Sequence, residues 1–275
     1  MLLEILKAVV FGIVEGITEW LPVSSTGHLI LLNEFLTLNV SDAFQEMFDV
    51  VIQLGAIFAV LVLFFRKLNP FSLKKSPAEK KDTWLLWGKV VFAVVPSAVL
   101  GLLFDDWFDE HFYNYTVVAM MLILYGIAFL FVERNNDAGR KMVAEVGAIS
   151  WKTALFIGAF QCLALIPGTS RSGATILGAI LLGVSRSAAS EFSFFLAIPT
   201  MLGASALKAL GFFLDGNTAG ATEIAVLITG MIVSFAVSMV AIRGLMDYVR
   251  RHKFSAFGIY RIILGALVLG YAFLR

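Results

Sequence analysis

Two stretches of sequence decide the fold, GIVEGITEWLPVSSTG at residues 12–27 and GAFQCLALIPGTSRSG at residues 158–173. Each places Pro, Gly, Ser and Thr in the middle of an apolar region. The apolar arms on either side are shorter than the about 20 residues that a helix needs to cross a bilayer. We therefore expect two re-entrant helical hairpins, over 5–38 and 151–184. Broken backbone at membrane depth is tolerated only where protein buries it or where it lines a wet cavity.

Composition places these stretches in a membrane protein. Of the 275 residues, 59% are hydrophobic and 15% are charged, and the mean hydropathy is +0.88. A soluble domain is about 45–50% apolar and about 25% charged, so the composition excludes a soluble enzyme and a disordered chain. The net charge of +1 is far from the strongly positive charge of a nucleic-acid-binding protein. The single cysteine excludes an internal disulfide. A single membrane domain over 1–275 remains.

Outside the two broken regions, six apolar stretches reach the length of a membrane span. They are 44–65, 84–104, 115–133, 190–212, 222–243 and 256–274. The sequence thus predicts an all-α integral membrane protein with six transmembrane helices plus two re-entrant helical hairpins.

The loops predict the orientation. Basic residues gather in 66–83, 133–152 and 243–253, whereas 39–49, 105–114 and 213–223 contain no Lys or Arg. Cytoplasmic loops carry the excess of positive charge. Both termini are therefore expected outside, with hairpin 5–38 entering from the outer side and hairpin 151–184 from the inner side.

The two broken regions also resemble each other. Glu15 and Gln161 each follow the first glycine of their stretch by the same interval, and the bounding glycines have equal spacing. Each half reads as one hairpin followed by three spans, so the second half starts on the opposite face. This indicates an inverted-topology repeat, with repeat one over 1–133 and repeat two over 151–275. In such repeats the site lies between the two broken elements.

Two carboxylates precede the first break. Glu15 and Glu19 are four residues apart, which puts them on one face of a helix, one turn apart. An ionisable residue at membrane depth costs about 2.5–3.5 kcal/mol on insertion scales and is a functional candidate by default. Alternatively, these glutamates only bond to neighbouring hydroxyls or backbone. The polar groups of the break that follows are Ser24, Ser25, Thr26 and His28.

The second break reads as an anion site. Its polar residues are Ser170, Arg171, Ser172 and Thr175. They precede a helical arm, and the N-terminus of a helix favours an anion. The guanidinium of Arg171 adds a planar fork that suits phosphate. Arg171 could equally be the counter-ion of Glu15 and Glu19, and the two interpretations are compatible.

Together the two breaks predict a diphosphate site that holds a metal. Carboxylates that face phosphate would repel it unless a hard divalent cation, Mg²⁺ or Ca²⁺, lies between them. For hydrolysis, a serine activated by His28 or by a glutamate could attack phosphorus, or a metal-bound water could do so.

Asp49 and Gln53, on the next helix, are candidate partners that support the first hairpin. Lys89, Lys208 and Arg261 lie near span ends, where we expect them to extend towards the interface.

Four motifs carry a family resemblance. They are EGITEWLPVSSTGH at 15–28, VVIQLGA at 50–56, PGTSRSGAT at 167–175 and SEFSFFLA at 190–197. The chain resembles the bacterial undecaprenyl-diphosphate phosphatases, also called bacitracin-resistance proteins. The resemblance implies a multi-pass enzyme of the bacterial cytoplasmic membrane, with its site open to the outer face. The implied reaction needs a divalent cation. It removes the terminal phosphate of undecaprenyl diphosphate to return the undecaprenyl phosphate carrier of cell-wall synthesis.

The family's motifs assign roles to residues of this chain. Its acidic motif falls on Glu15 and Glu19, as metal ligands or base, and its serine pair falls on Ser24 and Ser25. Ser25 is then the nucleophile, and His28 assists proton transfer. The family's arginine motif falls on Ser170, Arg171 and Thr175, which would hold the phosphates together with Ser24, Thr26 and Ser172.

A second function is open from sequence alone. A transporter or flippase for polyprenyl phosphate would also suit an inverted repeat with two broken elements. Release of phosphate by the purified protein distinguishes the hydrolase from the transporter.

Besides membrane lipid, a second copy of the chain in a homodimer is a partner that the sequence leaves open.

Overall fold

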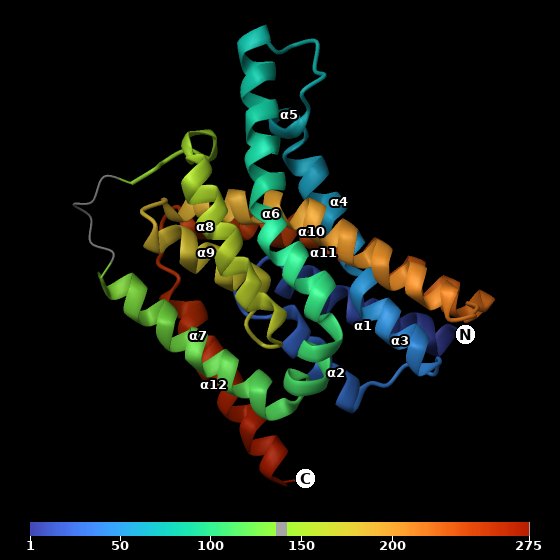
Figure 1. Cartoon of the computed structure of the whole chain (residues 1–275). Helices are drawn as coiled ribbons and strands as arrows, with labels where there is room; N and C mark the ends of the chain where they lie inside the picture. The colour runs from blue at the N-terminus through green and yellow to red at the C-terminus, as the bar shows by residue number, and fades with distance from the viewer. Residues whose placement is uncertain (136–141, 275) are drawn as a thin grey trace.

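The computed structural model describes residues 1–135 and 142–274 (Figure 1). Its elements in this part are helices, with one isolated bridge between Val143 and Val184. The prediction of an all-α protein is therefore confirmed. Residues 136–141 lie outside the described part. They include Arg140 and Lys141, two basic residues of the predicted loop 133–152.

In the described residues, six helices are long and apolar enough to cross a membrane. They are Asp42–Leu63, formed by α3 (Asp42–Val51) and α4 (Gln53–Leu63), then Pro77–Phe104 within α6 (Pro77–Phe112), α7 (Tyr115–Asn135), α10 (Arg186–Leu214), α11 (Ala221–Val249) and α12 (Ser255–Leu274). Each overlaps one predicted span, and the first ends at Leu63, two residues before the predicted end of 44–65. The six spans are confirmed. The chain is a multi-pass membrane protein.

Helix α6 is longer at both ends than the apolar stretch 84–104. At its start, the backbone N–H of Ser76 donates to Glu79 Oε2 at 2.7 Å, and the N–H of Glu79 donates to Ser76 Oγ at 3.3 Å. This reciprocal capping box, with proline at the first helical position, begins the helix at Pro77. At its other end α6 continues to Phe112, through most of the predicted loop 105–114. The connection that precedes α6 contains only the short α5 (Phe65–Leu68).

Each broken region forms two short helices around its break. The first has α1 (Leu2–Thr18) and α2 (Ser25–Phe35), and the second has α8 (Trp151–Cys162) and α9 (Arg171–Leu181). Two short 3₁₀ turns, η1 (Val146–Ala148) and η2 (Leu163–Leu165), precede and follow α8.

The two breaks end in the same local geometry. Ser24 (φ 74°) and Ser170 (φ 70°) are the two non-glycine residues with positive φ in the described chain. Each is the N-cap of the next helix, and each hydroxyl accepts a hydrogen bond from the backbone of a glycine three residues on, at 3.2 and 3.1 Å. A left-handed serine is strained. The cap bond helps to offset this strain, since it satisfies a helix N–H that would otherwise lack a partner.

Glycines allow the first helix of each broken region to cross a long helix closely. α1 packs on α11, where a Cβ added at Gly12 would lie 2.7 Å from the carbonyl oxygen of Gly230. α8 packs on α6, where a Cβ at Gly158 would lie 1.9 Å from the carbonyl oxygen of Ala93. The repeat motifs therefore begin at two helix crossings. In Figure 1, α7 and α12 lie side by side next to the broken regions.

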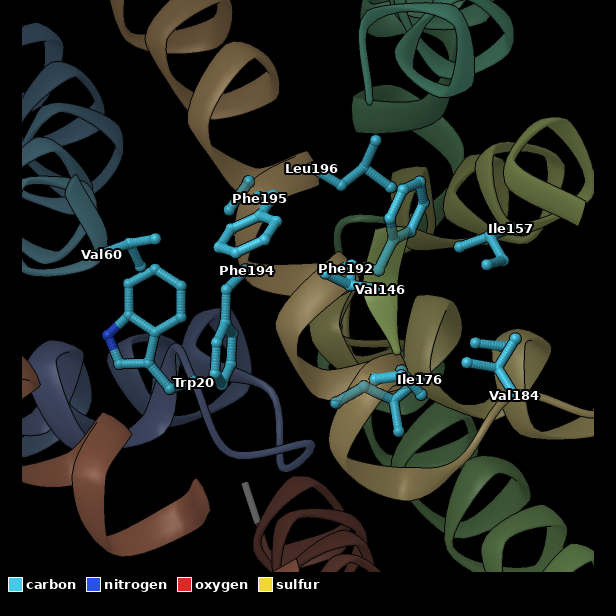
Figure 2. Close-up of a cluster of buried hydrophobic side chains, with 14 of the residues drawn as sticks. Trp20, Val60, Val146, Ile157, Ile176, Val184, Phe192, Phe194, Phe195 and Leu196 are labelled. Carbon is cyan, nitrogen blue, oxygen red and sulfur yellow. The ribbon is translucent and has the colours of Figure 1, made fainter. Parts of the chain in front are cut away.

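The largest buried cluster connects the first break to α10. Figure 2 shows Trp20 beside Phe194, and the two rings meet edge to face with centroids 5.2 Å apart. The cluster also contains Ile176 of α9 and Phe192 of α10. These apolar side chains hold α10 against both breaks, where the polar residues gather.

Candidate functional site

An ion pair joins the two breaks. Arg171 Nη2, at the start of α9, donates to Glu19 Oε1 at 2.8 Å, and both side chains are largely buried. Ser172 Oγ makes a second connection, because it donates to the carbonyl oxygens of Glu19 at 3.1 Å and Leu21 at 3.2 Å. Residues about 150 positions apart in sequence thus form one site.

Ser25 is hydrogen-bonded to the other oxygen of the same carboxylate. Its hydroxyl donates to Glu19 Oε2 at 2.7 Å, and the side chain is buried. A hydroxyl within hydrogen-bond reach of a base, which is itself oriented by a third group, is the arrangement of an activated nucleophile. Of the two bases that the sequence left open, the geometry favours Glu19.

The two ring nitrogens of His28 are bonded to partners other than Ser25. Its Nδ1 lies 2.7 Å from the carbonyl oxygen of Ser24, and its Nε2 lies 2.7 Å from Tyr260 Oη on α12. A carbonyl only accepts, so Nδ1 carries the hydrogen, and in the neutral ring Nε2 accepts from the tyrosine hydroxyl. The two rings are also parallel, with centroids 5.7 Å apart. His28 is therefore hydrogen-bonded to Tyr260, which was not among the predicted site residues.

Glu15 lies one turn before Glu19 on α1. It is fully buried, and neither of its carboxylate oxygens has a hydrogen-bond partner among the described residues. The alternative that it only bonds to neighbouring hydroxyls or backbone is therefore wrong for Glu15. A buried carboxylate without a partner is costly, so its oxygens are available as ligands.

The donor set fits a hard cation that is completed by substrate. In the described part of the chain, no three or more His, Cys, Asp or Glu residues form a metal-binding group. Mg²⁺ is often held by only one or two carboxylates plus the phosphate oxygens of a substrate. Glu15, with two free oxygens, and Glu19 can supply those carboxylates. The ion would supply charge neutralisation between the carboxylates and a bound diphosphate.

Arg171 is held from several sides. Its Nη1 donates to the carbonyl oxygen of Ser193 on α10 at 2.7 Å, and its guanidinium carbon lies 6.0 Å from the centre of the Trp20 ring. Its buried Nε has no partner among the described residues. One donor of the fork is therefore left for an anion.

The remaining polar groups of the second break hydrogen-bond among themselves or to α10. Ser170 Oγ lies 3.1 Å from Ser172 Oγ, and Thr175 Oγ1 lies 2.7 Å from Ser193 Oγ. Ser193 belongs to the motif at 190–197, and it was not among the predicted site residues. In the first break, Thr26 is half-buried in the opening turn of α2.

Asp49 and Gln53 lie on the next helices. Asp49 accepts from Asn33 Nδ2 of α2 at 3.2 Å and from Gln45 Nε2 at 2.8 Å. Gln53 Nε2 donates to the carbonyl oxygen of Asp49 at 3.4 Å. The structure thus connects Asp49 to the first broken region, and none of the bonds found in the described residues joins these two side chains to Glu15 or Glu19.

Arg261 is placed differently from its prediction. It was expected to extend towards the interface, and it is fully buried. The expectation is wrong because the guanidinium finds backbone carbonyls that the two breaks leave without helical partners. The signal was present in the sequence, since a charged residue in an apolar span is a functional candidate.

Comparisons with known proteins show which family the chain resembles over nearly its whole length. Residues 8–267 match the family model described as "Bacitracin resistance protein BacA". A protein of Enterococcus faecalis named undecaprenyl-diphosphatase is 60% identical, with 96% of each chain covered. Proteins of the same name from Lactiplantibacillus plantarum and Streptococcus pyogenes serotype M3 are 56% and 54% identical, covering 98% and 100% of this chain and 98% and 99% of theirs.

Proposed function

The chain belongs to the bacitracin resistance protein BacA family, and on this basis we propose that it is an undecaprenyl-diphosphatase. It hydrolyses the phosphoanhydride of undecaprenyl diphosphate and releases phosphate and undecaprenyl phosphate, the lipid carrier of cell-wall synthesis. Bacitracin resistance is the expected consequence of this activity. The observation that carries the proposal is the connected set of Ser25, Glu19 and Arg171, which joins the two breaks.

The first step is transfer of the terminal phosphoryl group to Ser25. The hydroxyl oxygen attacks the terminal phosphorus, its proton passes to Glu19, and the bond from this phosphorus to the bridging oxygen breaks. Undecaprenyl phosphate leaves with the bridging oxygen. Glu19 then passes the proton of the serine to the departing bridging oxygen. In the second step water attacks the phosphoserine and gives a proton to Glu19, the bond from phosphorus to Ser25 Oγ breaks, and Glu19 returns this proton to Oγ, which restores the hydroxyl as phosphate is released.

The second break stabilises the charge that develops on the phosphoryl oxygens. Arg171 provides the free Nε donor and positive charge, and the start of α9 provides oriented N–H groups close to the hydroxyls of Ser170 and Ser172. The carboxylates of Glu15 and Glu19 would hold a divalent cation, Mg²⁺ or Ca²⁺, against the diphosphate. His28 and Tyr260 form a hydrogen-bonded pair beside the serines that can orient water or move a proton.

We further propose that the two broken regions are re-entrant hairpins of an inverted-topology repeat. Their identical serine caps and the two glycine crossings support this arrangement. The site then opens to the outer face of the bacterial cytoplasmic membrane, since the first broken region enters from the side opposite the basic loops. Asp49 stabilises α2 from outside the reacting centre.

The test is phosphate release by protein purified in detergent, where no second compartment exists. The hydrolase predicts multiple turnovers in wild type and their loss in Glu19→Gln and Arg171→Ala. Protein that binds the diphosphate lipid and never liberates phosphate would instead support the transporter.

A further inference from the structure

One arginine on the last helix contacts both breaks. The fully buried Arg261 on α12 donates from Nη1 to the carbonyl oxygen of Pro22 at 3.0 Å, in the first break. From Nη2 it donates to the carbonyl oxygens of Gly168 at 2.8 Å and Thr169 at 2.9 Å, in the second break. Longer bonds from the same guanidinium reach α7, at Leu122 and Met121.

The charge of Arg261 has no carboxylate partner within 4.0 Å among the described residues, because its bonds go to backbone carbonyls. Burying a cation in this way is costly unless its hydrogen bonds are well satisfied. The ring of Tyr125, 5.4 Å from the guanidinium carbon, offsets part of that cost by a cation–π contact. An apolar side chain would cost less to bury in a membrane span, so the burial of this arginine is explained by its bonds to the two breaks.

The carbonyls that Arg261 binds lie directly before the residues that shape the site. Thr169 precedes Ser170, and Pro22 lies two residues before Ser24, and both serines hold the strained left-handed conformation. The next residue in each break is a member of the reacting set. A guanidinium is rigid and planar, so its two terminal nitrogens fix these carbonyls at a set separation.

We propose that Arg261 is a positioning residue for phosphoryl transfer: it holds the two breaks in register so that Ser25 and Glu19 meet Arg171. The proposal rests on the proposed function. It requires no contact between Arg261 and substrate. A displacement of about 1 Å at a reacting centre can lower the rate about 100-fold, which is the scale of effect expected when the fork is lost.

The experiment compares Arg261→Lys with Arg186→Lys in purified protein. Arg186 is a matched control, because it also donates through several nitrogens to a buried partner, Glu133, and that pair joins α7 to α10 outside the site. Lysine keeps the charge, but its donors share one nitrogen on a flexible chain, so it cannot fix carbonyls of the two breaks at a set separation. For Arg261→Lys we expect kcat per folded protein to fall about 30- to 100-fold while KM stays within about 3-fold. For Arg186→Lys we expect kcat within about 2-fold of wild type, whatever its melting temperature.

The outcomes separate the two proposals. If wild type releases phosphate and Arg261→Lys has the wild-type kcat per folded protein, Arg261 has only a structural role and the inference is overturned. A loss confined to yield or melting temperature overturns it as well. If wild type releases no phosphate, the proposed function itself fails. Should Arg261→Lys not fold, Arg261→Gln, which keeps one amide donor group on a shorter side chain, is measured in the same way against Arg186→Gln.

Discussion

At the scale of the residue, the account depends on how one carboxylate is shared. Glu19 accepts from Ser25 on one oxygen and from Arg171 on the other. A pair of charges in a medium of low dielectric attracts strongly, and the geometry orients the base towards the hydroxyl. Glu15, one turn away, has both oxygens free of hydrogen bonds from the described residues. The two neighbouring glutamates therefore have different environments: both are proposed to hold the cation, and Glu19 alone is proposed as the base.

Replacing Ser25 by Ala is expected to lower kcat about 10³-fold or more, because the nucleophile is lost while Glu19 and Arg171 remain. The measurement is phosphate release at saturating substrate. Ser41→Ala removes a serine of another helix cap, on α3, and should cost about 1 kcal/mol of stability and no activity. Near-normal turnover by Ser25→Ala would leave water as the nucleophile.

Tyr260→Phe removes the hydroxyl that His28 Nε2 accepts from, so the imidazole loses its orienting partner. We expect kcat to fall about 3- to 10-fold with little change in KM. Tyr248→Phe is the matched control, because Tyr248 stacks on His252 with ring centroids 4.6 Å apart, near the end of α11. Equal activity of the two variants would show that the His28–Tyr260 pair takes no part.

At the scale of the element, the residues at which helices begin can be predicted from local sequence patterns. Serine caps and glycines mark where α2 and α9 begin, and hydropathy marks the six spans. The start of α6 was missed because its capping box, Ser76 with Glu79, precedes the apolar stretch. The role of Arg261 was missed for a different reason: its partners exist only when both breaks are folded and adjacent. Long-range contacts of this kind have no local signature.

Gly158→Ala is expected to destabilise the protein more than any exposed glycine substitution, because its Cβ would collide with the backbone of α6. Overpacking of this kind typically costs about 1–3 kcal/mol, read as a lower melting temperature in detergent. Gly203→Ala on α10 is the control, since nothing lies within 4 Å of its Cβ. It should be neutral or stabilising by up to about 1 kcal/mol. Equal melting temperatures would contradict the close crossing of α8 on α6.

At the scale of the whole molecule, two halves that are similar in sequence contribute unlike groups to one site. The first supplies the carboxylates, the serine and the histidine, and the second supplies the arginine and a helix start. The sequence predicted the groups and the two breaks, since each is a local pattern. The hydrogen-bond partners within the site could not be predicted, because they depend on how α10 and α12 pack against the two breaks.

The proposed topology predicts the sides of two loops. In a Cys162→Ala background, a cysteine at Thr218 should react with a membrane-impermeant maleimide in intact cells, because 213–223 is an outer loop. A cysteine at Lys74 should react only after permeabilisation, since 66–83 is a basic, cytoplasmic loop. Both positions are exposed. The reverse pattern would turn the site towards the cytoplasm.

Removal of divalent cations should abolish turnover, because the carboxylates of Glu15 and Glu19 would then repel the diphosphate. Added Mg²⁺ or Ca²⁺ should restore it, and Glu15→Gln should raise the concentration of metal needed for half-maximal rate. The readout is phosphate release against free metal concentration. Full activity in excess chelator would remove the metal from the account.

The most direct test of the central claim is to find where the phosphoryl group goes. Wild-type protein is mixed with substrate labelled in the terminal phosphate, quenched within one turnover, and digested for mass spectrometry. The account predicts phosphoserine at Ser25, which appears and decays at rates compatible with kcat and is absent from Glu19→Gln. Label on Ser24 or His28, or single-turnover release of phosphate with no labelled peptide, would contradict it.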